Sequence, residues 1–252
     1  MRKGAAPFER RAGARPMVFG HRGVRRDGIT ENTPPAFEAA LDEGAEGIEL
    51  DVRVCRSGEL VVVHDPTLER ITGGADPRSV ADLSLAELRE VILPDGAHIP
   101  TLAEVLTFAR GRGAAVNVEM KRDAPSRAAI VKAVARLLDA WDPHHAVLVS
   151  SFDPGMLAAL ALLAPAVPRA VLVHRTRWHE LHAATSLGLG AHAVHLCRTL
   201  TRPELIARLK ALGLVVNVWT INDDREARDL AELGVDGLIT DAPGQIRGAL
   251  SA

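Results

Sequence analysis

The sequence predicts an eight-stranded parallel α/β barrel of the (β/α)8 type, and three observations support this prediction. Short apolar runs alternate with helical segments, and from Ala146 onward they recur at regular intervals, as in repeated strand–helix units. The chain has 252 residues, which is the length of one such barrel. One connection between apolar runs is too short for a parallel crossover and predicts a hairpin instead.

Nine apolar runs are predicted to be strands. They are Met17–Gly20, Gly47–Val54, Leu60–His64, Ala114–Met120, Ala146–Ser150, Arg169–Val173, Ala193–Leu196, Leu214–Trp219 and Gly237–Ile239. Only Cys55–Glu59 separate the second run from the third, so we expect these two runs to pair as an antiparallel hairpin. This leaves eight parallel strands. Counting outward from the turn, Asp51 is predicted to face His64.

Helix start and stop signals lie between these runs. Ser84 with Glu87, and Thr101 with Glu104, have the spacing of capping boxes. Asp153-Pro154 predicts an N-cap followed by proline at the first helical position. Three glycines that follow apolar-periodic stretches are predicted to end helices, namely Gly44, Gly213 and Gly234.

We predict a single domain over residues 17–252, preceded by a disordered tail over residues 1–16. Residues 66–100 carry loop signals on either side of one short helix. We interpret them as a small insertion that caps the barrel mouth, because such a short segment cannot bury a core of its own.

Composition excludes several classes of partner. The net charge of −2 provides no basic surface for nucleic acid and no polybasic run for a membrane, so we expect neither partner. Residues 1–16 lack the apolar stretch of a secretory signal. Cys55 and Cys197 are isolated and fit a reducing compartment, so a cytoplasmic location is expected. The sequence does not indicate an oligomeric state.

Three acidic residues lie at the carboxyl ends of predicted strands, where α/β barrels place their chemistry. Glu49 and Asp51 share one face of a strand because side chains alternate with a period of two, and Glu119 follows on a later strand. Adjacent carboxylates repel one another, and a divalent cation removes the conflict. The all-oxygen donor set suits Mg²⁺ or Ca²⁺ better than zinc.

Histidine and arginine at neighbouring strand ends indicate chemistry on a phosphate. His21-Arg22 ends the first predicted strand, and the hairpin brings His64 to the acids. Structural alternatives exist, since Glu119 and Lys121 can form an internal ion pair and a lone histidine can be a hydrogen-bonded core residue. The occurrence of all these groups at strand ends favours metal-assisted phosphate chemistry.

These motifs resemble those of the glycerophosphodiester phosphodiesterases, especially the compact cytosolic bacterial members. The resemblance extends from about Met17 to Asp241, nearly the whole chain. The matching strings are His21-Arg22-Gly23, Glu31-Asn32-Thr33, Glu49-Leu50-Asp51, His64-Asp65, Ile99-Pro100-Thr101-Leu102, Glu119-Met120-Lys121, Ser151-Phe152, Trp219-Thr220-Ile221-Asn222 and Gly234–Asp241.

The resemblance implies a TIM barrel of the phospholipase C-like phosphodiesterase type. It also implies metal-dependent hydrolysis of a glycerophosphodiester to sn-glycerol 3-phosphate and an alcohol. By this resemblance the general acid/base pair is His21 and His64, and one divalent cation, Mg²⁺ or Ca²⁺, is held by Glu49, Asp51 and Glu119. The remaining assignments are phosphate contacts by Arg22 and Lys121, substrate contacts by Trp219 and His195, and support of the site by Glu31 and Asn32.

Two alternative functions remain open. A related barrel can act on lysophospholipids or sphingomyelin-like lipids in the manner of phospholipase D, but such relatives are usually secreted. A barrel that only binds phosphate esters is expected to have lost some of its histidines or acids, and here the set is complete. The sequence does not choose between water and a substrate 2-hydroxyl as nucleophile, nor between the two histidines as acid and base.

Overall fold

Eight parallel strands form a closed ring in the computed structural model, which describes residues 6–141, 146–174 and 190–251. The strands are β1 (Met17–His21), β2 (Gly47–Val54), β4 (Ala115–Met120), β5 (Val147–Ser151), β6 (Arg169–Val173), β7 (Ala193–Cys197), β8 (Val215–Trp219) and β9 (Gly237–Thr240). Each strand pairs with its neighbour, and β1 closes the ring by pairing with both β2 and β9. The predicted (β/α)8 barrel is therefore confirmed.

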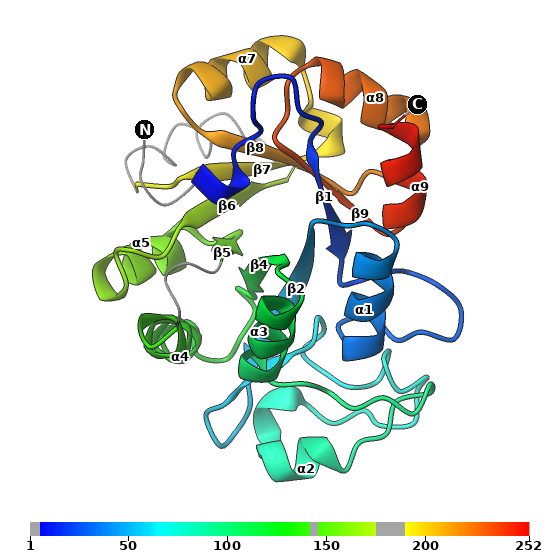
Figure 1. Ribbon diagram of the computed structural model, residues 1–252. Coiled ribbons are helices and arrows are strands. Elements are labelled where there is room, and N and C mark those ends of the chain that lie inside the picture. The colour runs from blue at the N-terminus through cyan, green and yellow to red at the C-terminus, as the bar shows by residue number, and fades with distance from the viewer. Residues whose placement is uncertain (1–5, 142–145, 175–189, 252) are drawn as a thin grey trace.

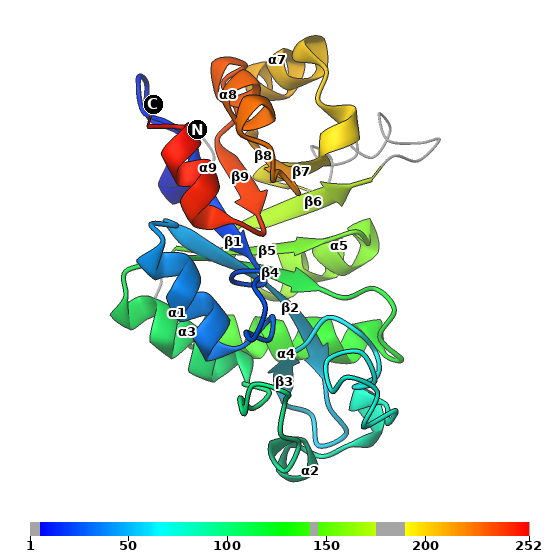
Figure 2. The same ribbon diagram turned by 90° about the vertical axis from the view of Figure 1, so that its right-hand side faces the viewer.

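Helices surround the ring on its outside (Figures 1 and 2). They are α1 (Pro34–Asp42), α3 (Leu102–Gly111), α4 (Arg127–Asp139), α5 (Pro154–Leu163), α7 (Pro203–Ala211), α8 (Asp224–Glu232) and α9 (Pro243–Ala249). The largest apolar cluster lies between these helices and the strands, and it includes Phe37 of α1, Ile48 of β2 and Leu106 of α3. In the described part of the chain, none of the helices has the length and apolar character needed to cross a membrane.

The predicted helix signals are confirmed where the structure describes them. Ser84 and Thr101 each form a complete capping box, with Glu87 and Glu104 respectively. Asp153 accepts hydrogen bonds from the first turn of α5, which begins at a proline. The three predicted stop glycines adopt the left-handed conformation that ends a helix at low cost, with φ of 92°, 72° and 81° at Gly44, Gly213 and Gly234.

The short strand β3 (Leu60–Val62) pairs antiparallel with β2, as predicted, but its register is shifted by one residue. Val52 pairs with Val62, and the N–H of Val63 donates to the carbonyl of Asp51, so Asp51 does not face His64. The predicted register is therefore wrong. His64 reaches the barrel mouth because β3 ends at Val62 and the chain bends at the following residues.

The turn between β2 and β3 explains the shift. Cys55 donates its N–H to the carbonyl of Glu59 over 3.0 Å, and Gly58 donates to Cys55 over the same distance. Gly58 has a φ of +97°, which is typical of a three-residue turn that ends in a bulge. This turn pairs Cys55 with Glu59 rather than with the predicted Leu60.

Residues 66–100 pack against the outer face of the hairpin. They contain η2 (Val80–Asp82) and α2 (Leu85–Arg89), which lies beside β3 and apart from the ring (Figure 2). Val61 and Val63 of the hairpin share a small apolar cluster with the insertion, and this cluster is distinct from the larger one between the helices and the strands. The insertion also contacts the loop after β1, where Asp95 accepts the N–H of Thr30 over 2.7 Å.

Part of the segment that was predicted to be a disordered tail is ordered and packs into the barrel. Ala6–Phe8 form the short helix η1, and Phe8 is only 2% exposed. The Phe8 ring stacks against Phe19 with ring centroids 6.4 Å apart, in a cluster that includes Ala115 and Ala193, the first residues of β4 and β7. The tail prediction is therefore wrong from Ala6 onward, and residues 1–5 lie outside the described residues.

Candidate active site

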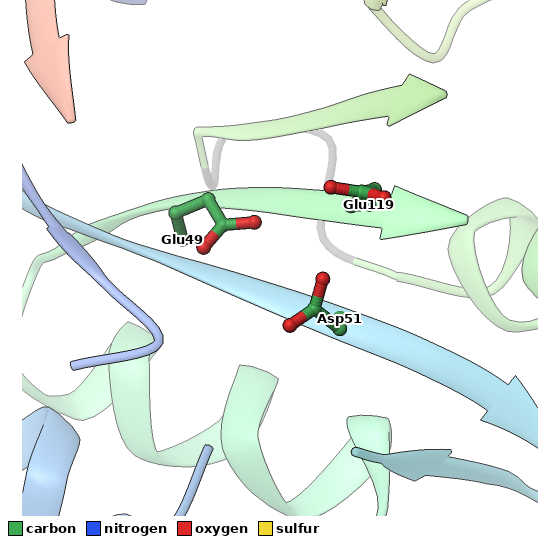
Figure 3. Close-up of side chains that lie close together, drawn as sticks. All are labelled: Glu49, Asp51 and Glu119. Atoms are coloured by element: carbon green, nitrogen blue, oxygen red, sulfur yellow. The ribbon is translucent and has the colours of Figure 1, made fainter. Parts of the chain in front are cut away.

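Three carboxylates meet at the carboxyl ends of two adjacent strands. Glu49 and Asp51 lie on β2, and Glu119 lies on β4 at the register position opposite Asp51. Figure 3 shows these side chains on neighbouring strands, and one oxygen from each lies within 4.8 Å of the others. All three residues are buried. The two-residue period of a strand and the parallel register thus bring the predicted metal ligands together.

Asp51 is the acid with the most cationic surroundings. Its Oδ1 accepts a hydrogen bond from Lys121 over 3.0 Å, and its Oδ2 accepts one from Asn32 over 2.9 Å and lies 3.1 Å from Nε of Arg22. Burial alone would raise the pKa of Asp51, but the charges of Lys121 and Arg22 hold this pKa well below its ordinary value. Asp51 is therefore ionised, and its Oδ1 keeps one unused lone pair.

The other two acids carry a charge conflict. Burial and the negative charge of Asp51 raise the pKa of Glu49 to about 8. The same two causes raise the pKa of Glu119, although Lys121 donates to its Oε1 over 2.8 Å. A buried cation would remove this conflict. The donor set consists of carboxylate oxygens and fits one hard divalent cation such as Mg²⁺ or Ca²⁺.

His21 ends β1 and is held by the residue that follows the last strand of the ring. Its Nδ1 lies 2.7 Å from Oδ1 of Asp241, whose other oxygen accepts a hydrogen bond from Asn222 over 2.8 Å. Burial lowers the pKa of His21, but the contact with Asp241 and the charge of Glu49 outweigh it, so the pKa is raised. This contact leaves Nε2 available to a substrate.

His64 is held in the same way from the other side of the site. Its Nδ1 lies 2.5 Å from Oδ1 of Asp65, and its backbone carbonyl accepts two hydrogen bonds from Arg53, over 2.9 and 2.6 Å. Arg53 in turn forms an ion pair with Asp123 over 2.9 Å. Burial lowers the pKa of His64, and although the charge of Asp51 opposes this, the pKa remains below its ordinary value.

Arg22 follows His21 in a tight turn that depends on glycine. Gly23 has a φ of +93°, and a Cβ on it would lie 2.5 Å from the carbonyl carbon of Ala36 in α1. The N–H of Arg22 donates to the carbonyl of Glu49 over 2.9 Å. Its guanidinium lies between Asp51 and Glu31, and Nη1 donates to Glu31 over 3.0 Å. The turn thus places a cation beside the acids.

These groups surround a cavity of about 230 Å³. Its polar side includes both imidazoles, and its apolar side includes Phe152 and Trp219, whose rings pack edge to face with centroids 5.6 Å apart. None of the described residues that line it comes from the insertion. The lining residues are His21, Arg22, Glu49, His64, Asn117, Glu119, Lys121, Phe152, Leu172, Trp219 and Ile239.

Comparison with known proteins agrees with this geometry. Residues 21–245 match the model of the Glycerophosphoryl diester phosphodiesterase family. The chain belongs to this family. It is 33% identical to a glycerophosphodiester phosphodiesterase of Bacillus altitudinis, and the match covers 90% of this chain and 94% of the relative. A relative of the same description from Caldanaerobacter subterraneus is 31% identical, with the same two coverages.

The fold of this chain is also similar to solved structures of phosphodiesterases. A glycerophosphodiester phosphodiesterase from Agrobacterium tumefaciens superposes with a TM-score of 0.77 at 28% identity, over 94% of this chain and 100% of that chain. A phosphodiesterase from Oleispira antarctica superposes with a TM-score of 0.82 at 26% identity, over 94% and 98%. The Oleispira structure is a complex with the product sn-glycerol-3-phosphate.

In the present protein most of the predicted site residues line the cavity, but His195 lies away from it. His195 is 0% exposed, and its ring lies between the amides of Asn117 and Asn217, 3.5 and 3.1 Å from their nitrogens. Its backbone carbonyl accepts the indole N–H of Trp219 over 3.1 Å. His195 therefore supports the cavity from beneath, whereas Trp219 lines it.

Glu31 and Asn32, predicted to support the site, contact its charged groups in the phosphodiesterase. Glu31 holds Arg22, and the Asn32 side chain holds Asp51 through two hydrogen bonds. Helix α1 begins after Thr33, whose hydroxyl donates to Thr30 instead of capping the helix.

Sequence reasoning missed the groups that hold the two imidazoles. Asp65 and Asp241 both lie in the motif strings, and the contacts of their side chains depend on how distant segments meet. For Asp65 the available signal was its position directly after His64. For Asp241 it was the end of the last predicted strand.

Proposed function

We propose that this protein hydrolyses glycerophosphodiesters to sn-glycerol 3-phosphate and an alcohol in a reaction that depends on a divalent cation. One observation carries the proposal: two imidazoles, each held through Nδ1 by a carboxylate, line a single cavity. The same cavity is lined by two acids, Glu49 and Glu119, and by two cations, Arg22 and Lys121. The product bound to the Oleispira phosphodiesterase supports this choice of substrate.

The cations of the site offset the charge of the phosphodiester. A phosphodiester anion repels an incoming nucleophile, and its charge on the phosphoryl oxygens grows toward the transition state. Arg22 and Lys121 line the cavity and are held rigidly by buried carboxylates, so they stabilise this charge without reorganising. A divalent cation bound by Glu49, Asp51 and Glu119 would supply Lewis-acid charge at the same oxygens.

His21 and His64 carry out the proton transfers. One imidazole takes the proton from the attacking hydroxyl as the new P–O bond forms, and the other donates a proton to the leaving alkoxide as the old bond breaks. The attacking group is water or the 2-hydroxyl of the glycerol, which would first close a cyclic phosphate. In both cases each imidazole uses Nε2, because a carboxylate occupies Nδ1.

The apolar side of the cavity accommodates the uncharged part of the substrate. Trp219 is fixed by its hydrogen bond to the His195 carbonyl and by its contact with Phe152. An aromatic pair of this kind packs against carbon atoms of the glycerol or head group.

The variants His21→Ala and His64→Ala test the proposal. With glycerophosphocholine as substrate, each variant is expected to lose at least about 100-fold in kcat, since positioned acid/base groups contribute about 10²–10⁴-fold. His98→Ala, a variant of an exposed histidine in the insertion, serves as the control and keeps full activity. The measurement is release of glycerol 3-phosphate, with the midpoint of urea unfolding recorded for each variant.

Two outcomes would contradict the proposal. If either histidine variant keeps kcat within about fivefold of the parent, the paired mechanism is wrong, since a lost acid/base group costs far more. If the parent turns over lysophosphatidylcholine but not glycerophosphocholine, the substrate class is wrong.

A further inference from the structure

We propose that Arg70 is a positioning residue that fixes His64 and Arg22 at the same time. It contacts neither the cavity nor the three clustered acids, and it acts through Asp65 and Glu31. Because His64 and Arg22 receive their roles from the proposed function, the role of Arg70 rests on that function.

The contacts of Arg70 form a bridge between two separate motifs. Its Nε donates to Oδ2 of Asp65 over 2.5 Å, and its Nη2 donates to Oε1 of Glu31 over 2.7 Å. The other oxygen of Asp65, Oδ1, lies 2.5 Å from Nδ1 of His64. Oε1 of Glu31 also accepts from Nη1 of Arg22. One guanidinium therefore orients both carboxylates that hold the two groups.

The backbone around Arg70 is held in place by buried neighbours and hydrogen bonds, so the Arg70 side chain starts from a fixed position. Leu68 and Ile71 on either side are buried in the apolar cluster that the insertion shares with the hairpin. The N–H of Thr72 donates to the carbonyl of Leu68 over 3.0 Å, and the N–H of Gly74 donates to that of Glu69 over 2.7 Å. A planar guanidinium that extends from such a fixed backbone presents its N–H donors in a fixed geometry.

Stability alone does not account for this arrangement. The Arg70 side chain is 49% exposed, and ion pairs with exposed arginines contribute little to folding because water screens them. Its two carboxylates are each 23% exposed and each also bind a group of the site. Without Arg70, Asp65 keeps only His64 among its side-chain partners in the described residues and is free to rotate.

The first test compares Arg70→Ala and Arg70→Lys with Arg78→Ala. Arg78 is a matched control because it lies in the same insertion, is 53% exposed and pairs with Asp76 away from the cavity. Arg70→Ala is expected to lower kcat about 10- to 100-fold, as loss of a supporting partner typically does. Arg70→Lys recovers part of this loss, because lysine keeps the positive charge but lacks the planar guanidinium that donates to both carboxylates. Arg78→Ala leaves kcat unchanged.

A second test separates the two arms of the bridge. Asp65→Asn is expected to lower kcat with little change in KM, because it loosens His64. Glu31→Gln is expected to lower kcat and also to raise KM, because Arg22 contacts the phosphate in the bound substrate and stabilises its growing charge in the transition state. In the Asp65→Asn/Glu31→Gln background, Arg70→Ala is expected to change kcat and KM by less than about twofold, since residues that act as a unit are not additive.

Chemical rescue distinguishes positioning from a structural role. Millimolar guanidinium should restore part of the kcat of Arg70→Ala, and it should not restore His64→Ala or alter Arg78→Ala. The proposal is overturned if Arg70→Ala keeps full activity while His64→Ala is inactive. It is also overturned if the loss of kcat in Arg70→Ala follows a loss of folded protein and adds fully to the Asp65→Asn and Glu31→Gln effects. If His64→Ala is itself fully active, the proposed function fails instead.

Discussion

At the scale of single residues, the two imidazoles differ in what holds their carboxylates. Asp241, which holds His21, is itself held by the neutral amide of Asn222. Asp65, which holds His64, is held by the cationic Arg70. Burial lowers the pKa of both histidines. At His21 the contact with Asp241 and the charge of Glu49 outweigh burial and raise the pKa, whereas at His64 the pKa stays lowered despite the charge of Asp51.

Residue types and spacings predicted the groups that form the site but not the groups that hold them. Glu49, Asp51 and Glu119 could be placed together because strand periodicity fixes the face of each side chain and parallel strands end at the same edge of the sheet. The bridge through Arg70 joins the insertion to the loop after β1, and no local pattern encodes that contact. His195 was misplaced because a polar residue on a strand can face a cavity or the layer beneath it.

His195 leads to a prediction about stability and pH. Burial lowers its pKa to about 3, from an ordinary value of 6.5. The unfolded chain therefore binds a proton below pH 6.5 that the folded chain does not bind until about pH 3, so stability present above pH 6.5 is lost as the pH falls. His195→Gln should remove this contribution and make the free energy of unfolding about 1.4 kcal/mol less steep per pH unit between pH 6 and 4.

Urea unfolding of both proteins at pH 7, 6, 5 and 4 measures this difference. The substitution itself adds an offset that does not depend on pH, and the other titrating groups are common to both proteins. Equal slopes for the parent and His195→Gln would show that the imidazole already titrates normally in the folded state.

At the scale of elements, turns and termini depart most from the sequence-based expectations. The hairpin was predictable from the short connection, but its register depends on whether Gly58 forms a bulge, and a glycine permits several turn types. The burial of Phe8 depends on the small side chains of Ala115 and Ala193, which leave space inside one end of the ring. Those alanines come from strands distant in sequence, so the N-terminal segment showed no local signal for order.

Phe8 is expected to stabilise the barrel without affecting catalysis. Phe8→Ala should lower the free energy of unfolding by about 3 kcal/mol, because it removes a buried ring and leaves a cavity. The kcat at 25 °C should be unchanged, since Phe8 packs at the amino ends of the strands and the site lies at their carboxyl ends. Arg11→Ala, at an exposed position of the same segment, is the control. A Phe8→Ala protein as stable as this control would contradict the assigned packing.

At the scale of the whole molecule, the closed ring brings a cluster of buried charges together at the carboxyl ends of its strands. Three carboxylates share the mouth with Lys121 and Arg22, so a bound cation should stabilise the fold as well as the reaction. An apolar cluster that includes Phe8 and Phe19 lies inside the amino end of the ring.

Removal of metal is expected to affect both activity and stability. Excess chelator should abolish turnover of glycerophosphocholine, and Mg²⁺ or Ca²⁺ should restore it. At a free metal concentration of 100 times Kd, the cation should add about 2.7 kcal/mol to the free energy of unfolding. When metal is added, the thermal unfolding midpoint of Glu119→Gln should rise by less than that of the parent protein, because one ligand of the cation has lost its charge. Full activity in excess chelator, with no shift in the midpoint on adding metal, would exclude the cation site.

The contact between His21 and Asp241 joins two residues that are 220 positions apart in the sequence. His21 belongs to the first strand of the ring, and Asp241 follows the last one. During synthesis, an emerging polypeptide would expose every other group of the site before this carboxylate leaves the ribosome. A chain that stops before Gly237 would lack the last strand of the ring and the carboxylate that holds His21, so such a truncated chain is expected to be inactive.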